Sequence, residues 1–189
     1  MVKKSYIIFD LDETIGQFVQ LGYFYKGLIH YFNKVPTKNE FYQLLNRCNK
    51  YFRPKMFEIL NHIKLHKLKD QHLNVVIYTN NQGGKSWVTK IKDFMELKIQ
   101  YRLFDRIIGP HKIREELYEI LRTTESKCYD DLVKIIDCND KEDILFLDDN
   151  FYNEMLKDNV IYLLVKPYRY YYKSIELVFL TKPFSNFLK

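Results

Sequence analysis

The sequence predicts an α/β fold, a Rossmann-like three-layer sandwich with a parallel five-stranded sheet. Two observations lead to this prediction. Short apolar runs alternate along the chain with stretches of helical periodicity, which is typical of parallel strands joined by helices on both faces of a sheet. The runs are also nearly continuous rather than alternating with polar residues, as expected of strands that are buried on both sides.

The expected strands are short and follow one another at intervals that leave room for helices. They cover residues 5–9, 73–78, 103–108, 144–147 and 160–165. Gly109-Pro110 and Pro167 stop the third and fifth strands, because proline cannot donate to a ladder of hydrogen bonds. In an open parallel sheet the carboxyl ends of the strands meet at one edge, where ligands bind.

Capping residues and apolar spacing predict the helices of the first half of the chain. Thr37 and Glu40 form a capping box that opens a helix over residues 38–49. Pro54 begins a second helix, since proline is favoured in the first turn. Ser86 is expected to cap a long basic helix that runs to about residue 97.

The remaining segments are predicted from composition. Further helices are expected in 127–136, in 153–157 and in part of 111–126. The aromatic segment 17–25 has a glycine near its middle, and we interpret it as a hairpin. The aromatic run 168–172 and the segment after it are expected to pack along the outside.

Bulk properties limit the kind of protein. The length of 189 residues suits one domain, 1–189, with a small insertion at about 16–52. No apolar run approaches the ~18 residues that span a bilayer, and the first strand begins too early for a signal peptide. Cys48, Cys128 and Cys138 are odd in number without CxxC spacing, so we expect an intracellular protein, cytoplasmic or nuclear.

The first strand ends in two acids, and the rest of the chain is organised around them. Asp10 and Asp12 are two residues apart, so their side chains share a face if the chain is extended. Carboxylates this close repel each other unless one is protonated or a cation lies between them. Mg2+ is the usual cation, with substrate phosphate completing its coordination shell.

Other chemically active residues are predicted at the same edge of the sheet. They are Thr14 in the first loop, Thr79 after the second strand, a lysine before the fourth, and Asp148 and Asp149 after it. Each type has a task in phosphoryl transfer. A carboxylate can attack phosphorus, a second can move the proton, and a hydroxyl and a lysine can hold the phosphoryl oxygens.

These motifs together resemble the haloacid dehalogenase (HAD) superfamily. More narrowly, Asp-Leu-Asp-Glu-Thr, Arg53-Pro54 and Arg102-Leu103-Phe104 are similar to the branch of RNA polymerase C-terminal-domain phosphatases, also called NLI-interacting-factor-like. The resemblance spans about residues 5–165. Large DNA viruses encode similar short proteins, and a viral member would act in its host cell.

The resemblance implies roles for the acids. Asp10 would be the nucleophile that forms an aspartyl-phosphate, and Asp12 would be the general acid/base. Asp10, the backbone carbonyl of Asp12, and Asp149 would bind Mg2+, and Asp148 would support this metal site. The second aspartate of the motif points to phosphatase rather than dehalogenase chemistry.

The resemblance also implies a binding site for the phosphoryl group. Thr79 and the amide of Asn80 would hold it, and Thr14 would brace the loop. The active-site lysine would be Lys127, which lies one helical turn before the family's position, or Lys134. We favour Lys127.

The insertion bears on the substrate. At about 37 residues it is too short for the large cap that encloses small metabolites in many superfamily members. An open site favours a macromolecule, with a phosphoserine or phosphothreonine protein such as the C-terminal domain of RNA polymerase II as the leading expectation. The aromatic side chains of the insertion could line a proline-containing peptide or form its own core. They are Phe18, Tyr23, Phe24 and Tyr25.

Alternative functions remain on the same fold. A phosphatase of nucleic-acid 3′ ends or nucleotides would suit the net charge of +6, which favours anionic partners. The expected basic helix would serve it through Lys85, Lys90, Lys92 and Lys98. A phospho-accepting receiver is disfavoured because its acidic pair follows the first strand. A non-catalytic phosphopeptide-binding module is disfavoured because every catalytic position is filled.

Overall fold

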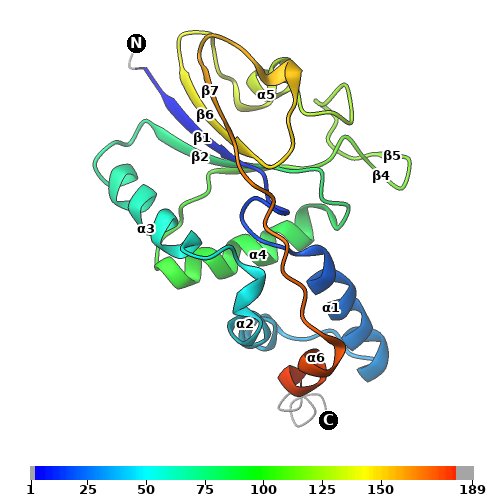
Figure 1. Ribbon diagram of the computed structural model, residues 1–189. Coiled ribbons are helices and arrows are strands. Elements are labelled where there is room, and N and C mark those ends of the chain that lie inside the picture. Colours follow the sequence, from blue (N-terminus) through cyan, green and yellow to red (C-terminus); the bar gives the residue numbers. More distant parts are fainter. Residues whose placement is uncertain (1–2, 182–189) are drawn as a thin grey trace.

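A sheet of five parallel strands forms the centre of the computed structural model, which describes residues 3–181 (Figure 1). The strands lie in the order β3-β2-β1-β6-β7. Their bounds are β1 (Ser5–Phe9), β2 (Leu73–Tyr78), β3 (Arg106–Ile108), β6 (Asp143–Asp148) and β7 (Val160–Leu164). The predicted α/β fold with a five-stranded parallel sheet is therefore confirmed.

Helices cover both faces of this sheet. The helical elements are α1 (Val19–Phe32), α2 (Lys38–Arg47), η1 (Asn49–Tyr51), α3 (Met56–Lys67), α4 (Gly84–Ile99), α5 (Tyr129–Ile136), η2 (Asn153–Met155) and α6 (Ser174–Thr181). The helices α3 and α4 lie on one side of the sheet and α5 on the other (Figure 1). Within residues 3–181 none of these helices has the length and apolarity needed to cross a membrane.

The central strand β1 separates two hydrophobic clusters. Ile8 belongs to the cluster under α5, whereas Phe9 belongs to the larger cluster under α3 and α4. This alternation follows from the strand geometry, because successive side chains point to opposite faces. Since both faces are covered, β1 is aromatic or aliphatic from residue 6 to residue 9, and the first charged residue after it is Asp10, beyond its end.

The insertion leaves and rejoins the sheet domain at one narrow neck. Gly16 pairs with Phe52 in an antiparallel bridge, and the backbone N–H of Arg53 donates to the carbonyl of Ile15 over 2.9 Å. A Cβ atom at Gly16 would lie 2.3 Å from the carbonyl oxygen of Tyr51, so only glycine fits this approach of two chains. The two residues of this bridge are the first and last of the insertion expected at about 16–52, whose status as an insertion stays a prediction.

The interpretation of residues 17–25 as a hairpin is wrong, because most of this segment lies in α1. The helix buries Leu21 and Tyr25, which are four residues apart, and such residues share a helix face. Gly22 stands next to Trp87 of α4, whose Cζ2 would lie 3.6 Å from an added Cβ. The glycine therefore marks a close contact between two helices rather than a turn.

The expectation of helix in part of 111–126 is also wrong. This segment contains a two-stranded antiparallel hairpin made of β4 (Lys112–Ile113) and β5 (Glu116–Leu117). The third strand of the main sheet is shorter than expected, because β3 pairs with β2 only from Arg106 onward. Elsewhere the expected elements are present with ends shifted by a few residues, and the capping box of Thr37 and Glu40 is formed.

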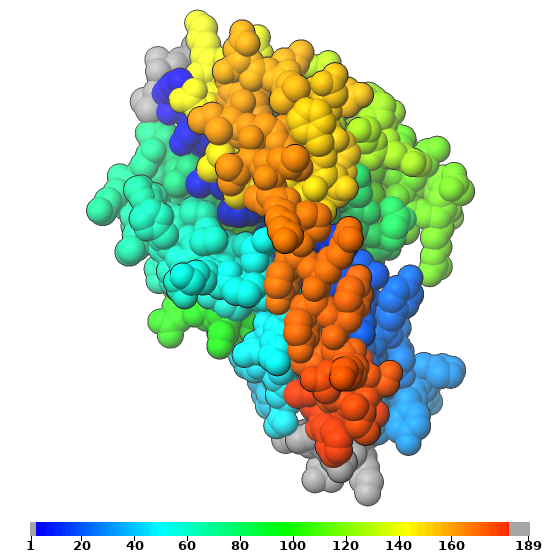
Figure 2. All heavy atoms as spheres, viewed as in Figure 1, coloured from blue at the N-terminus to red at the C-terminus, as the bar shows by residue number. Residues whose placement is uncertain are grey.

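An extended segment, residues 165–173, leaves β7 and crosses the molecule to α6 (Figure 1). Figure 2 shows it in orange on the surface, between the blue α1 and the cyan end of the insertion. Its aromatic side chains contact that insertion. The hydroxyl of Tyr168 donates to the carbonyl of Lys50 over 2.8 Å, and the backbone N–H of Tyr172 donates to Oε1 of Gln20 over 3.0 Å. The segment runs along the outside as predicted, except that the side chain of Tyr172 is buried. Residues 182–189, which the same prediction included, lie outside the described residues.

Candidate active site

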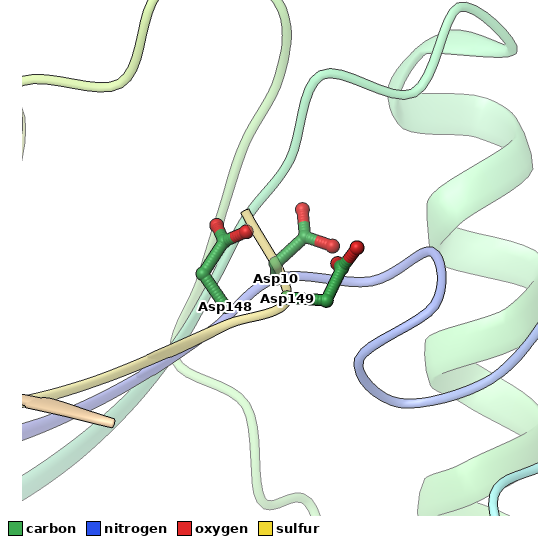
Figure 3. Close-up of side chains that lie close together, drawn as sticks. All are labelled: Asp10, Asp148 and Asp149. Carbon is green, nitrogen blue, oxygen red and sulfur yellow. The ribbon is translucent and has the colours of Figure 1, made fainter. Parts of the chain in front are cut away.

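Three carboxylates converge at the carboxyl edge of the sheet (Figure 3). Asp10 directly follows β1, Asp148 ends β6, and Asp149 follows it. Because β1 and β6 are neighbours in register, the residues after them are brought together. One oxygen from each carboxylate lies within 4.8 Å of the others. Asp10 and Asp148 are buried and Asp149 is partly buried.

Lys127 is the cation of this site. Its Nζ donates to Oδ1 of Asp10 over 2.5 Å and to Oδ2 of Asp148 over 2.6 Å. The side chain is 1% exposed, and a buried ammonium is tolerated only when it is paired. Lys134, the rival lysine, is exposed on α5. The structure thus brings Lys127 to the acids and leaves Lys134 in solvent.

Burial is the largest single influence on the pKa values of the ionisable groups in this site. Burial raises the pKa of Asp10 to about 7. Lys127 acts to lower this pKa, and repulsion by Asp148 acts to raise it. Burial also raises the pKa of Asp149, against the hydrogen bond from Thr14. Burial lowers the pKa of Lys127, but Asp10 and Asp148 outweigh it and raise that pKa above its ordinary value. The positive charge of Lys127 therefore does not offset the effect of burial on the pKa of Asp10.

The three acids fit a hard divalent cation. Carboxylate oxygens are the ligands that Mg2+ and Ca2+ take, and a bound cation reverses the penalty that burial places on ionised acids. The geometry therefore supports a metal site of three acidic residues, Asp10, Asp148 and Asp149. The side chain of Asp12 lies outside this group of oxygens.

Asp12 is held on the other side of the same loop. Its Oδ2 accepts from Nδ2 of Asn81 over 2.5 Å and its Oδ1 from the backbone N–H of Phe18 over 3.3 Å. Burial raises the pKa of Asp12, although these hydrogen bonds lower it. Asn81 is a site residue that the sequence did not assign. Nothing in the sequence marks Asn81 as a site residue except its position two residues after Thr79.

Thr79 and Asn80 follow β2, next to the acids, and both line the same cleft. The Oγ1 atom of Thr79 accepts from the backbone N–H of Asn81 over 3.1 Å. Asn80 is fixed by Arg122, whose Nη1 donates to its Oδ1 over 2.7 Å. Both predicted residues therefore lie at the edge where the acids meet.

Arg122 is a second residue that the sequence did not assign. It is 2% exposed, and its Nη2 donates to the carbonyls of Glu125 and Ser126 over 2.9 Å. It therefore links Asn80 to the segment that directly precedes Lys127. Nothing in the local sequence marks this arginine, because its partner Asn80 comes from a loop 42 residues away.

Hydrogen bonds made by Thr14 and Arg53 brace the first loop. The hydroxyl of Thr14 donates to Oδ1 of Asp149 over 3.1 Å. Arg53 donates to the carbonyls of Thr14 and Glu13, each over 2.6 Å, and to that of Lys166 over 2.7 Å. Glu13 has a positive φ of 60°, a conformation that needs such support. These contacts fit the bracing role expected of Thr14.

A cleft of about 1120 Å³ opens above these residues. Asp10, Asp12 and Asp149 line one end, together with Thr79 and Asn80. The cleft then continues between α1 and the β4–β5 hairpin, over the first turns of α4. Figure 1 shows the hairpin and α1 on opposite sides of the amino end of α4.

The aromatic residues of the insertion divide between core and cleft. Phe18 and Tyr25 are buried, with ring contacts to Phe52 and Phe41 at centroid distances of 5.1 and 5.0 Å, yet both border the cleft. Tyr23 also borders it and is 73% exposed. Phe24 packs against the core. The core alternative therefore holds for Phe18, Phe24 and Tyr25, and the role of Tyr23 in lining a peptide stays a prediction.

The basic helix α4 presents fewer free charges than its sequence suggests. Lys85 pairs with Glu119 and Lys92 with Glu96. Lys98 donates to Oδ1 of Asn46. Of the four lysines named for nucleic-acid binding, Lys90 borders the cleft.

Comparisons of the chain with protein-family models, with curated proteins and with solved structures found no match.

Proposed function

We propose that this protein is a Mg2+-dependent phosphatase that hydrolyses phosphomonoesters through an aspartyl-phosphate intermediate. The observation that carries the proposal is the arrangement of Asp10, Asp12 and Lys127 at the acid end of an open cleft. The order of motifs along the chain resembles the phosphatases of the HAD superfamily. This resemblance and the geometry support the same chemistry.

In the first step Asp10 attacks. One of its carboxylate oxygens forms a bond to phosphorus while the bond from phosphorus to the ester oxygen breaks. Asp12 donates its proton to the leaving oxygen, which departs as an alcohol. The raised pKa of Asp12 suits this task, because a general acid must still carry its proton near neutral pH.

In the second step water hydrolyses the aspartyl-phosphate. Asp12, now ionised, takes a proton from water, and the water oxygen bonds to phosphorus. The bond from phosphorus to the Asp10 oxygen breaks, which releases inorganic phosphate and restores the carboxylate. The two residues therefore return to their starting states after each turnover.

The surrounding residues orient these groups. Lys127 holds one oxygen of Asp10 and offers positive charge beside the phosphoryl oxygens. Thr79 and Asn80 lie where a hydroxyl and an amide can bind those oxygens. Asp10, Asp148 and Asp149, with the carbonyl of Asp12, would hold Mg2+, which when bound neutralises charge on the phosphoryl group.

The shape of the site favours a macromolecular substrate. The cleft is larger than a typical pocket for a small ligand, roughly 300–1,000 Å³, and its mouth is formed by α1 and a short hairpin rather than a closed cap. We therefore propose a phosphoserine or phosphothreonine segment of a protein as the substrate. The C-terminal domain of RNA polymerase II is one such segment.

The test is hydrolysis of para-nitrophenyl phosphate with Mg2+ and with EDTA, by the wild type and by Asp10→Asn. We expect a Mg2+-dependent rate in the wild type and a loss of at least about 10³-fold in the variant, because the nucleophile is removed. Asp158→Asn, at an exposed position outside the cleft, is the matched control and should keep the full rate.

A folded wild type that binds Mg2+ but hydrolyses nothing would contradict the proposal. Circular dichroism and calorimetric Mg2+ titration establish those two conditions. Trapping of 32P on the wild type by acid quenching, and its absence from Asp10→Asn, would identify the intermediate itself.

A further inference from the structure

The cleft extends well beyond the residues that the proposed reaction uses. Its far part is lined by α1, by the first turns of α4 and by the β4–β5 hairpin. Three cations from these three elements border it: Lys26, Lys90 and Arg114. None of them forms an ion pair with another residue in the range 3–181. Glu116 of the hairpin also borders the cleft.

Each of the two helical cations lies one helical turn beyond the contact between α1 and α4. Gly22 of α1 packs against Trp87 of α4. Lys26 follows Gly22 by four residues and Lys90 follows Trp87 by three, so each lies on the same face as the contact, one turn further on. Both side chains are exposed and border the cleft, where they can contact a ligand.

The third cation is held by an unusual turn. Arg114 and Glu115 are the two central residues of the hairpin, with φ of 50° and 67°. Type I′ turns have this geometry and normally use Asn-Gly, because other residues lose about 1–2 kcal/mol in the left-handed region. Backbone strain of this kind is typical of functional sites.

The hairpin itself is anchored to α4. The hydroxyl of Tyr118 accepts from the backbone N–H of Lys85 over 2.5 Å, and the side chain of Ile113 packs at Gly84. Nε2 of Gln82 donates to the carbonyl of Lys112 over 3.3 Å. The position of Arg114 over the cleft is therefore fixed from its base.

We propose that Lys26, Lys90 and Arg114 form a second anion subsite, which binds a phosphate or acidic side chains of the substrate protein other than the phosphate that is hydrolysed. This inference rests on the proposed function. Its separation from the acid end follows from α1, which begins directly after Phe18, whose backbone N–H donates to Asp12. Lys26 lies seven residues after the first residue of this helix, or about 10 Å along it. About three residues of extended peptide cover that distance.

The wall between the two ends favours a peptide over a nucleic acid. Val19, Tyr23 and Trp87 border the cleft there, and they are apolar or aromatic. A nucleic acid carries a phosphate at every nucleotide and binds through cations along its whole track. A peptide can place apolar residues between two anionic ones.

The experiment compares two fluorescent peptides of one sequence, phosphorylated at one serine or at two serines three to four residues apart. Binding is measured by anisotropy with Asp10→Asn, so that the phosphate is retained, and kcat/KM is measured with the wild type. We expect at least tenfold tighter binding and a similar gain in kcat/KM for the doubly phosphorylated peptide. Each cation should supply about threefold, and the gain should shrink as salt rises.

The key variant is Lys26→Ala/Lys90→Ala/Arg114→Ala. It should lower the ratio of the two affinities to near one, and a ratio cancels any general loss of binding. The matched control, Lys4→Ala/Lys134→Ala/Lys141→Ala, removes the same charge from exposed positions outside the cleft and should keep the ratio.

Three outcomes decide the matter. Equal affinities for the two peptides in the wild type, or an unchanged ratio in the key variant, overturns the subsite. A 3′-phosphorylated oligonucleotide whose binding needs the three cations, with peptides indifferent to them, assigns the site to nucleic acid instead. Discrimination between the peptides without hydrolysis of any substrate supports the subsite and refutes the proposed reaction.

Discussion

The two ends of the cleft are built in opposite ways. At the acid end, Asp10, Asp148 and Lys127 are buried and each is bonded to another site residue. At the far end, Lys26 and Arg114 are exposed and border the cleft without an ion partner among residues 3–181. A reaction centre needs groups fixed in place, whereas recognition of a flexible chain can use mobile surface cations. Changes at the acid end should therefore have large effects, and changes at the far end small ones.

Among variants that keep the proposed nucleophile, the largest effect is expected at Lys127. Lys127→Met removes the ammonium and leaves the buried carboxylates of Asp10 and Asp148 without it. We expect turnover of para-nitrophenyl phosphate to fall by about 10²–10³-fold, as when one charge-stabilising donor is lost. The free energy of unfolding without Mg2+ should fall by about 3–5 kcal/mol, the cost of breaking a buried ion pair.

Lys134→Met serves as its control, because that lysine is exposed on the adjacent helix. Steady-state kinetics and urea unfolding give both quantities. If the two variants behaved alike, the contrast between a fixed acid end and a solvated exterior would be wrong.

The next largest effect is expected at Arg122, whose hydrogen bonds go to Asn80 and to backbone carbonyls rather than to Asp10 or Asp148. Arg122→Lys keeps the charge but cannot bridge Asn80 to the carbonyl of Ser126, a link that needs both guanidinium nitrogens. We expect kcat to fall by about tenfold or more, because small misplacements in an active site are costly.

The measurement must separate position from stability. Kinetics are therefore measured at least about 15 °C below the melting temperature of the variant. At this margin a few kcal/mol of stability remain, so the unfolded fraction is small. Full activity in a destabilised Arg122→Lys would show that Arg122 stabilises the fold without positioning Asn80 or Lys127.

The third prediction concerns charge balance at the acid end. The pKa of Asp10 is raised in the folded state to about 7, so the metal-free fold keeps a proton that the unfolded chain loses near its ordinary pKa. Stability from this source is complete below about pH 4 and is lost as pH rises to about 7. The raised pKa values of Asp12 and Asp149 act in the same direction.

Bound Mg2+ should reverse this loss, since it favours the ionised acids. At a hundredfold excess over its Kd it should add about 2.7 kcal/mol. Urea unfolding at pH 5 and pH 7.5, with EDTA or Mg2+, tests both statements, and Asp149→Asn should weaken the gain. Equal stability with and without the metal at pH 7.5 would argue against a cation site there.

The same contrast explains what the sequence could predict. Apolar runs located all five strands, and the acids after β1 and β6 could be assigned to one edge because parallel strands end there. Asn81 and Arg122 could not be found in this way, since their importance lies in contacts with Asp12 and Asn80, which only the folded chain brings close.

The elements of the far end were the ones misread. The helix α1 was interpreted as a hairpin because Gly22 and aromatic residues suggested one, although Gly22 lies within the helix, next to Trp87. The hairpin β4–β5 was missed because its turn is Arg114-Glu115, whereas the recognisable signal for such a turn is Asn-Gly. Both misread elements, α1 and the β4–β5 hairpin, line the part of the cleft where we place recognition of the substrate.

The smallest effect is expected at that turn, and it should have the opposite sign from the others. Arg114→Asn/Glu115→Gly replaces two residues of positive φ with the pair that a type I′ turn prefers. The free energy of unfolding should rise by about 1 kcal/mol, while the preference for a doubly phosphorylated peptide weakens. Glu115→Gly alone relaxes one strained residue and keeps Arg114, so it should raise stability and retain the preference. Urea unfolding and peptide binding on these two variants separate strain from charge. A double variant with unchanged stability would mean that the turn costs nothing, and the case for Arg114 would then rest on its charge and its place at the cleft.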